Sequence, residues 1–147
     1  MFSEGAWYRR TAMKVIIKTE GGKSIGFGHF SRCISLYQAF LKKGIRPLFS
    51  INNSFVAKDF FRRNKINFLI AYNLKNIDCD ILIIDSYLTP KDFYYKASKN
   101  VKLLVSIDDF NRLSYPSGLV VNGSIYAKSI NYKKKKNLKY LLGPDYI

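Results

Sequence analysis

A chain of 147 residues is long enough to bury one hydrophobic core, so we expect a single domain. Its hydrophobic content of 48% excludes a disordered protein, and no apolar stretch approaches the ~20 residues that a membrane-spanning helix needs. The formal net charge of +15 would suit nucleic acid or an anionic membrane surface, but the lysines are scattered along the chain and form no single binding stripe.

The start of the chain predicts no structure of its own. Residues 1–12 contain no apolar segment of the kind that a signal peptide needs, and we interpret them as an extension or a tag outside the fold. Cys33 and Cys79 have neither the spacing of a metal site nor that of a disulfide framework, which indicates inert thiols in a reducing compartment. We therefore expect a cytoplasmic protein whose domain spans residues 13–147.

Strand-like and helix-like segments alternate along the chain. Apolar and β-branched runs predict strands at 13–18, 46–51, 66–70, 80–85, 101–107, 119–122 and 138–142. Helices are predicted at 29–43, at 55–64 and from Thr89-Pro90 onward. Alternation throughout the chain is typical of right-handed crossovers, so we expect an α/β fold with a doubly wound, mostly parallel open sheet of the Rossmann-like kind.

The ends of these helices carry recognisable signals. Asn53 or Ser54 is suited to cap the second helix, and Thr89 followed by Pro90 is typical of a cap and a first helical position. The spacing of apolar residues in the first helix predicts that five side chains point inward: Ile34, Leu36, Tyr37, Phe40 and Leu41.

The stretch from Gly26 to Arg32 joins the first strand to the first helix and contains the only histidine, His29. The glycines at 26 and 28 allow a ligand to approach the backbone, and a helix N-terminus favours an anionic group. The same partial positive charge disfavours imidazolium, so we expect a neutral His29 near pH 7, as a general base must be. A lone histidine is more often structural, but ligands of open α/β sheets bind at this edge.

A dinucleotide site is a poorer interpretation of the same glycines. Ser31 replaces the third glycine of that motif, and the second strand ends in Asn52 and Asn53 with no acid for a ribose.

Polar side chains also follow the fourth and fifth predicted strands. Asp85 and Tyr87 come after the fourth strand, and Asp108 and Asp109 come after the fifth. A single acid in such a position is usually a loop anchor. Because parallel strands end at the same edge, we expect these residues beside His29, where they favour a binding site.

Four motifs in order resemble the N-terminal domain of the UDP-sugar hydrolases of bacterial pseudaminic acid synthesis, enzymes of the two-domain glycosyltransferase-B fold. The motifs are Ile25-Gly-Phe-Gly-His29 with Arg32, Leu82-Ile-Ile-Asp85-x-Tyr87, Ser106-Ile-Asp108-Asp109, and Val121-Asn122 followed by Tyr126-Ala127-Lys128-x-x-x-Tyr132. Any one of them is weak, but four in register are specific. The resemblance covers residues 13–147 and only the family's N-terminal half.

The resemblance implies inverting hydrolysis of a UDP-linked diacetamido sugar with release of UDP. It assigns His29 as the base that deprotonates the attacking water, with no metal and no cofactor. The substrate-binding residues that it implies are Gly26, Gly28, Arg32, Asp85, Tyr87, Asp108, Asp109 and Asn122. In this family the second domain grips the diphosphate, so a second domain or chain is expected to complete the cleft.

Two other functions fit the same sequence. One is half of a glycosyltransferase that delivers the sugar to an acceptor instead of water. The other is a basic binding module without chemistry, although the run Lys133–Lys136 is typical of a solvated turn and predicts no specific nucleic-acid site.

Overall fold

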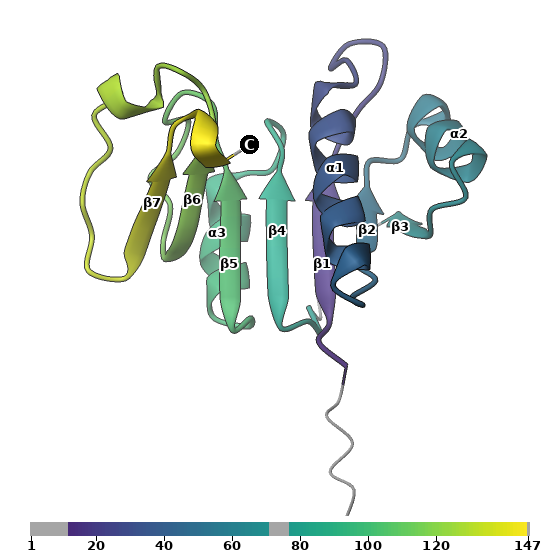
Figure 1. The fold of residues 1–147 in the computed structure, drawn as a ribbon, viewed down its shortest axis with the longest axis horizontal. Coiled ribbons are helices and arrows are strands. Elements are labelled where there is room, and N and C mark those ends of the chain that lie inside the picture. Colours follow the sequence, from purple (N-terminus) through teal and green to yellow (C-terminus); the bar gives the residue numbers. More distant parts are fainter. Residues whose placement is uncertain (1–11, 71–76, 147) are drawn as a thin grey trace, which may run out of the picture.

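The structure is a computed structural model that describes residues 12–70 and 77–146. All seven strands belong to one sheet, in the order β3-β2-β1-β4-β5-β6-β7, and every neighbouring pair is parallel (Figure 1). The strands are β1 Val15–Thr19, β2 Leu48–Ile51, β3 Phe68–Ile70, β4 Ile81–Asp85, β5 Leu103–Ile107, β6 Gly118–Asn122 and β7 Leu138–Leu142. The predicted α/β fold with an open parallel sheet is confirmed. The predicted extension, residues 1–12, lies outside the described residues except for its last residue.

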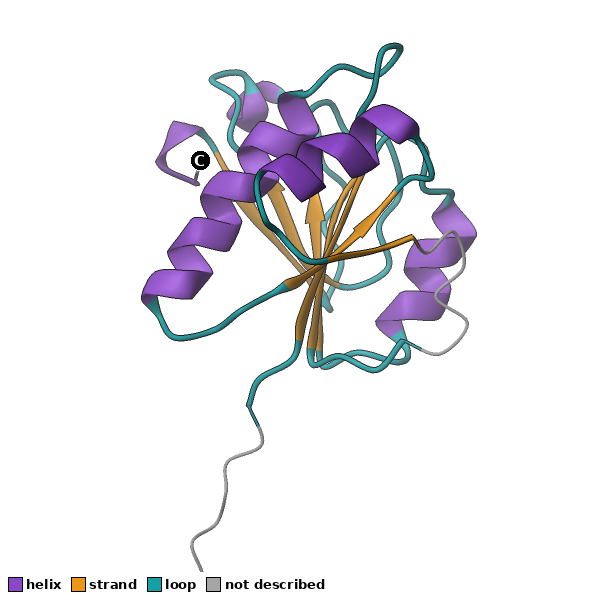
Figure 2. Ribbon diagram, turned by 90° about the vertical axis from the view of Figure 1, so that its right-hand side faces the viewer, coloured by secondary structure: helices purple, strands orange, loops and turns teal. Residues whose placement is uncertain are grey.

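Helices cover both faces of the sheet (Figure 2). On one face, α1 (Gly28–Lys42) and α2 (Phe55–Arg63) pack against a core cluster that includes Ile17 of β1. On the other face, α3 (Lys91–Ser98) packs against a second cluster that includes Ile16. Adjacent residues of one strand point to opposite faces, so β1 is buried on both sides, as a central parallel strand should be.

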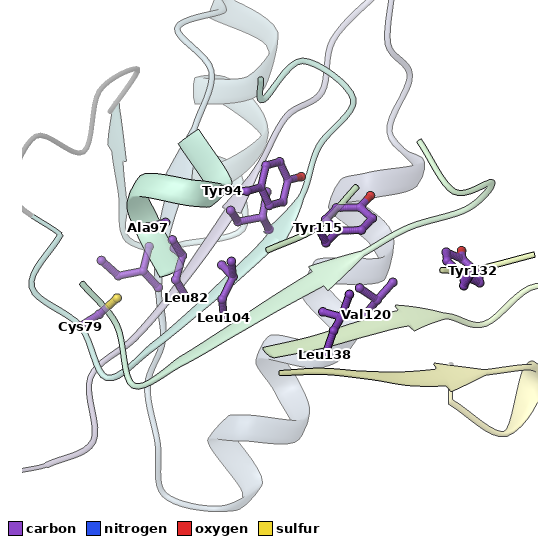
Figure 3. Close-up of a cluster of buried hydrophobic side chains, with 11 residues drawn as sticks. Cys79, Leu82, Tyr94, Ala97, Leu104, Tyr115, Val120, Tyr132 and Leu138 are labelled. Atoms are coloured by element: carbon purple, nitrogen blue, oxygen red, sulfur yellow. The ribbon is translucent and has the colours of Figure 1, made fainter. Parts of the chain in front are cut away.

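The second core cluster runs across four strands beneath α3. Figure 3 shows Leu82, Leu104, Val120 and Leu138, which come from β4, β5, β6 and β7 in that order. Tyr94 and Ala97 of α3 cover one end of this row, and the aromatic rings of Tyr115 and Tyr132 belong to the same cluster. Those two tyrosines come from the loops that follow β5 and β6, so the loops take part in the core.

The predicted alternation is wrong in the second half of the chain. The described connection from β5 to β6 (108–117) contains no helix, and the connection from β6 to β7 (123–137) contains only a 3₁₀ turn, Ala127–Ser129. These loops bury tyrosines and a carboxylate, as described below, and so cover the sheet without a helix. No helix in the described part of the chain is long and apolar enough to cross a membrane.

Several local predictions can be compared with the structure. Ser54 caps α2, because its Oγ accepts the Ala57 N–H at 3.0 Å. Thr89 does not cap α3: Pro90 is the cap residue, and the Thr89 hydroxyl is instead 2.7 Å from Ser86 Oγ. Leu41 is exposed, contrary to the prediction, because Phe30, Cys33 and Tyr37 define the buried side of α1.

Candidate functional site

The glycine loop between β1 and α1 places His29 at the carboxyl edge of the sheet. Gly22 and Gly26 exchange backbone hydrogen bonds of 3.2 and 2.8 Å, and Gly26 has a φ of +82°, which L side chains rarely adopt. Gly28 is the first residue of α1, and a Cβ atom built there meets no atom within 4 Å. The loop therefore needs glycine at 26 for its conformation, and the glycine at 28 leaves open space next to His29.

His29 forms a short contact with Asp85 at the end of β4. The distance between His29 Nδ1 and Asp85 Oδ1 is 2.6 Å, and both side chains are buried. This contact arises because β1 and β4 are neighbours, with Thr19 opposite Asp85. The prediction that His29 and Asp85 lie at the same edge is confirmed.

Arg32 lies one turn further along α1 and joins two carboxylates from different strands. Its Nε and one terminal nitrogen each donate to Asp85 at 2.7 Å. Its other terminal nitrogen donates to Asp109, after β5, at 2.7 Å. The guanidinium therefore neutralises both acids.

These contacts determine the charge of Asp85. Burial disfavours the carboxylate, but the hydrogen bonds from His29 and Arg32 outweigh burial and hold the pKa of Asp85 below its ordinary value. An ionised Asp85 can only accept, so the His29 Nδ1 carries a hydrogen and donates to it.

The surroundings of His29 shift its pKa in the direction opposite to the one expected from the helix N-terminus. The hydrogen bond to Asp85 raises the pKa of His29 above its ordinary value of 6.5, although burial and the nearby Arg32 act in the opposite direction. The expected direction of the shift is wrong because a carboxylate in direct contact outweighs the partial charge of a helix end.

The second ring nitrogen of His29 is free to act on another molecule. His29 Nε2 has no hydrogen-bond partner among the described residues, whereas Nδ1 is held by Asp85. A donor at Nδ1 leaves the lone pair of a neutral imidazole on Nε2. This is the arrangement in which a buried carboxylate orients a histidine base.

Tyr87 forms the wall beside His29. Its ring centroid is 4.4 Å from that of His29 in an edge-to-face arrangement, and its hydroxyl donates to Asp109 at 2.6 Å. Burial and the hydrogen bond to Asp109 raise the pKa of Tyr87 to about 12, so the phenol is neutral near pH 7. Four of the predicted site residues, Arg32, Asp85, Tyr87 and Asp109, thus surround His29.

Asp108 and Asn122 belong to a different group of side chains, a buried network that also includes Tyr132. Asp108 accepts hydrogen bonds from the hydroxyls of Tyr115 and Tyr132 at 2.8 and 2.5 Å. Asn122 is fully buried and donates to the Tyr132 hydroxyl at 2.9 Å. The structure does not bring these two residues into contact with His29, and their recorded partners give them an internal anchoring role.

Glu20 is a site residue that the sequence reasoning missed. It follows β1 directly, is 96% buried, and accepts the backbone N–H groups of Tyr87 at 2.5 Å and Leu88 at 2.9 Å. It also accepts a hydrogen bond from Ser86 Oγ. The rule that drew attention to Asp85, an acid after a buried strand, would have found Glu20 as well.

The described residues contain no group of three or more His, Cys, Asp or Glu side chains arranged to hold a metal ion. A hollow of about 50 Å³ lies beside Glu20, lined among others by Lys18, Asn52 and Thr89. At this volume it has room for a few water molecules.

Comparison with known proteins gives one distant relative. No family model matches the chain, and no solved structure matches it significantly. An uncharacterized protein of Methanocaldococcus jannaschii is 28% identical in an alignment of 149 positions, which covers 92% of this chain and 30% of the relative. The chain thus spans about 30% of the length of that relative, and the similarity assigns no activity.

Proposed function

We propose that this chain is the base-carrying half of a hydrolase that cleaves a UDP-linked diacetamido sugar with water. The observation that carries the proposal is the Asp85–His29 pair, with Nδ1 held at 2.6 Å and Nε2 without a partner among the described residues. The substrate class comes from the resemblance of the four sequence motifs to the pseudaminic acid pathway hydrolases.

In this proposal His29 Nε2 takes a proton from the attacking water. The water oxygen forms a bond to the anomeric carbon while the bond from that carbon to the UDP oxygen breaks, and UDP leaves with the bonding electrons. Attack from the face opposite UDP inverts the configuration. Asp85 stabilises the imidazolium that forms, and Arg32 keeps Asp85 ionised so that it remains an acceptor.

The exposed side chains at this edge support the proposal that another domain or another chain covers it. The described residues include thirteen exposed large hydrophobic side chains, and eight of them follow the carboxyl end of a strand. We call these eight the apolar rim: Phe27, Phe55, Tyr87, Leu88, Phe110, Ile125, Tyr126 and Tyr146. Exposed apolar side chains along one edge of a sheet favour burial against another protein surface.

The test is to measure hydrolysis of the UDP-linked sugar by a protein that contains this domain together with the second domain or chain that covers its edge. We expect His29→Asn to lower kcat by about 10²–10⁴, because it removes the base and keeps a polar side chain. KM should change far less, since the diphosphate is held elsewhere in this proposal. Gln38→Asn, an exposed change on the same helix, is the matched control and should be neutral.

Three results would contradict the proposal. A near wild-type kcat in His29→Asn would make His29 a structural residue. Release of UDP only when a sugar acceptor is present would favour the transferase. Salt-dependent binding to arbitrary DNA together with no turnover would favour the basic binding module.

A further inference from the structure

The peptide unit of Tyr87 is held from both sides by charged side chains. On one side, the carboxylate of Glu20 accepts the N–H groups of Tyr87 and Leu88 and the hydroxyl of Ser86. All three donors belong to the loop between β4 and α3, whereas Glu20 directly follows β1. Glu20 therefore ties this loop to the strand that leads into the His29 loop.

On the other side, the side chain of Arg112 donates a hydrogen bond to the backbone carbonyl oxygen of Tyr87. Its guanidinium donates to the carbonyl oxygens of Tyr87 at 3.2 Å and Thr89 at 3.1 Å. The backbone N–H of Arg112 is itself held by Asp108 at 3.1 Å. The buried network around Asp108 thus fixes the loop from which Arg112 reaches Tyr87.

The fixed backbone has a consequence for the ring. Tyr87 is 45% exposed, so packing alone restrains its side chain weakly. Nevertheless its ring lies perpendicular to the His29 ring, with the two ring centroids 4.4 Å apart, and its hydroxyl donates to Asp109. Both contacts require the backbone of Tyr87 to stay where Glu20 and Arg112 hold it.

We propose that Glu20 and Arg112 are positioning residues that clamp the Tyr87 peptide and thereby hold the Tyr87 ring against His29. The clamp serves catalysis only if the proposed function holds, but its geometric claim stands on the contacts above. Neither residue acts on the substrate in this inference.

The single histidine makes the clamp measurable in the 147-residue chain itself. The ring protons of His29 lie in the ring current of Tyr87, so their NMR shifts, recorded at a pH where the imidazole is neutral, report the position of that ring. Tyr87→Leu supplies the reference without a ring current. We expect Glu20→Ala and Arg112→Ala each to move the His29 shifts most of the way to that reference, and Glu20→Gln, which keeps an acceptor oxygen, to stay near wild type.

The two alanine variants separate positioning from charge. Glu20→Ala removes a negative charge and Arg112→Ala removes a positive one, so their effects on the local electrostatic potential are opposite. Loss of the clamp, in contrast, moves the His29 shifts in the same direction in both variants. Asp59→Ala and Arg63→Ala, which break a surface ion pair on α2, are the matched controls and should leave the shifts unchanged. Folded Glu20→Ala and Arg112→Ala chains with wild-type shifts, or with shifts of opposite sign, would overturn the inference. Since no substrate is used, failure of UDP-sugar hydrolysis leaves this result untouched.

Discussion

The start of α1 and the carboxylate of Asp85 shift the pKa of His29 in opposite directions. The start of α1 contributes roughly half an elementary charge of positive sign, which disfavours imidazolium. Asp85 contributes a full negative charge in direct hydrogen-bond contact, and the pKa of His29 is raised. A base with a raised pKa is protonated over a wider range, so hydrolysis should fall as the pH drops through that raised value.

Arg32 limits how far the pKa of His29 rises, because its positive charge lies close to the imidazole and is shared with Asp85. In Arg32→Gln the repulsion disappears and Asp85 is less neutralised, so we expect the pKa of His29 to rise above the wild-type value. Arg32→Lys keeps the charge and should give a smaller rise. The measurement is an NMR titration of His29, and an unchanged or lower pKa in Arg32→Gln would contradict this account.

At the scale of residues, the sequence predicted the members of the site better than their roles. His29, Arg32, Asp85 and Asp109 come together because parallel strands end at one edge, and that rule needs no atomic detail. Asp108 is adjacent to Asp109 yet points to the buried tyrosines. Neighbouring residues of an extended chain face opposite ways, and the sequence does not show which of two adjacent acids faces the site.

At the scale of elements, the buried network around Asp108 covers the sheet where helices were expected after β5 and β6. The Tyr132 hydroxyl donates to Asp108 and accepts from Asn122, so it joins the end of β5 to the end of β6. Strands were predictable from their apolar runs, and β7 has the predicted bounds. The loops 108–117 and 123–137, which contain no α-helix, were not predictable from the sequence. Their buried side chains bond to residues that are distant in sequence, and such contacts leave no periodic pattern.

We expect Tyr132→Phe to lower the free energy of unfolding by about 1–3 kcal/mol, since it leaves a buried acceptor and a buried donor each short of one partner. Tyr126→Phe is the matched control: Tyr126 is 70% exposed, and its change should stay within about 0.5 kcal/mol. Urea unfolding with an unchanged m value measures both. Equal stabilities of the two variants would show that the network contributes nothing.

At the scale of the whole molecule, the proposed function makes the carboxyl edge of the sheet one side of a cleft that a second domain or chain completes. The apolar rim follows the carboxyl ends of six strands, at the same edge of the sheet as His29. A site with one wall neither excludes water nor orients the leaving group.

We therefore expect the purified 147-residue chain to hydrolyse a UDP-linked diacetamido sugar very slowly or not at all. Release of UDP, followed over time, is the measurement, with a protein that contains both walls as the positive control. Robust turnover by the chain alone would contradict the need for a second wall.

The central claim is that Asp85 holds His29 through Nδ1 and leaves Nε2 as the base, and a pH titration of ¹⁵N-labelled His29 by NMR tests it most directly. Nitrogen shifts report which ring nitrogen carries the hydrogen, and the chain has only one histidine. The account predicts a neutral form protonated at Nδ1 and a pKa above 6.5 that falls in Asp85→Asn. A wild-type pKa at or below 6.5 that Asp85→Asn leaves unchanged, or a neutral form protonated at Nε2, would contradict it.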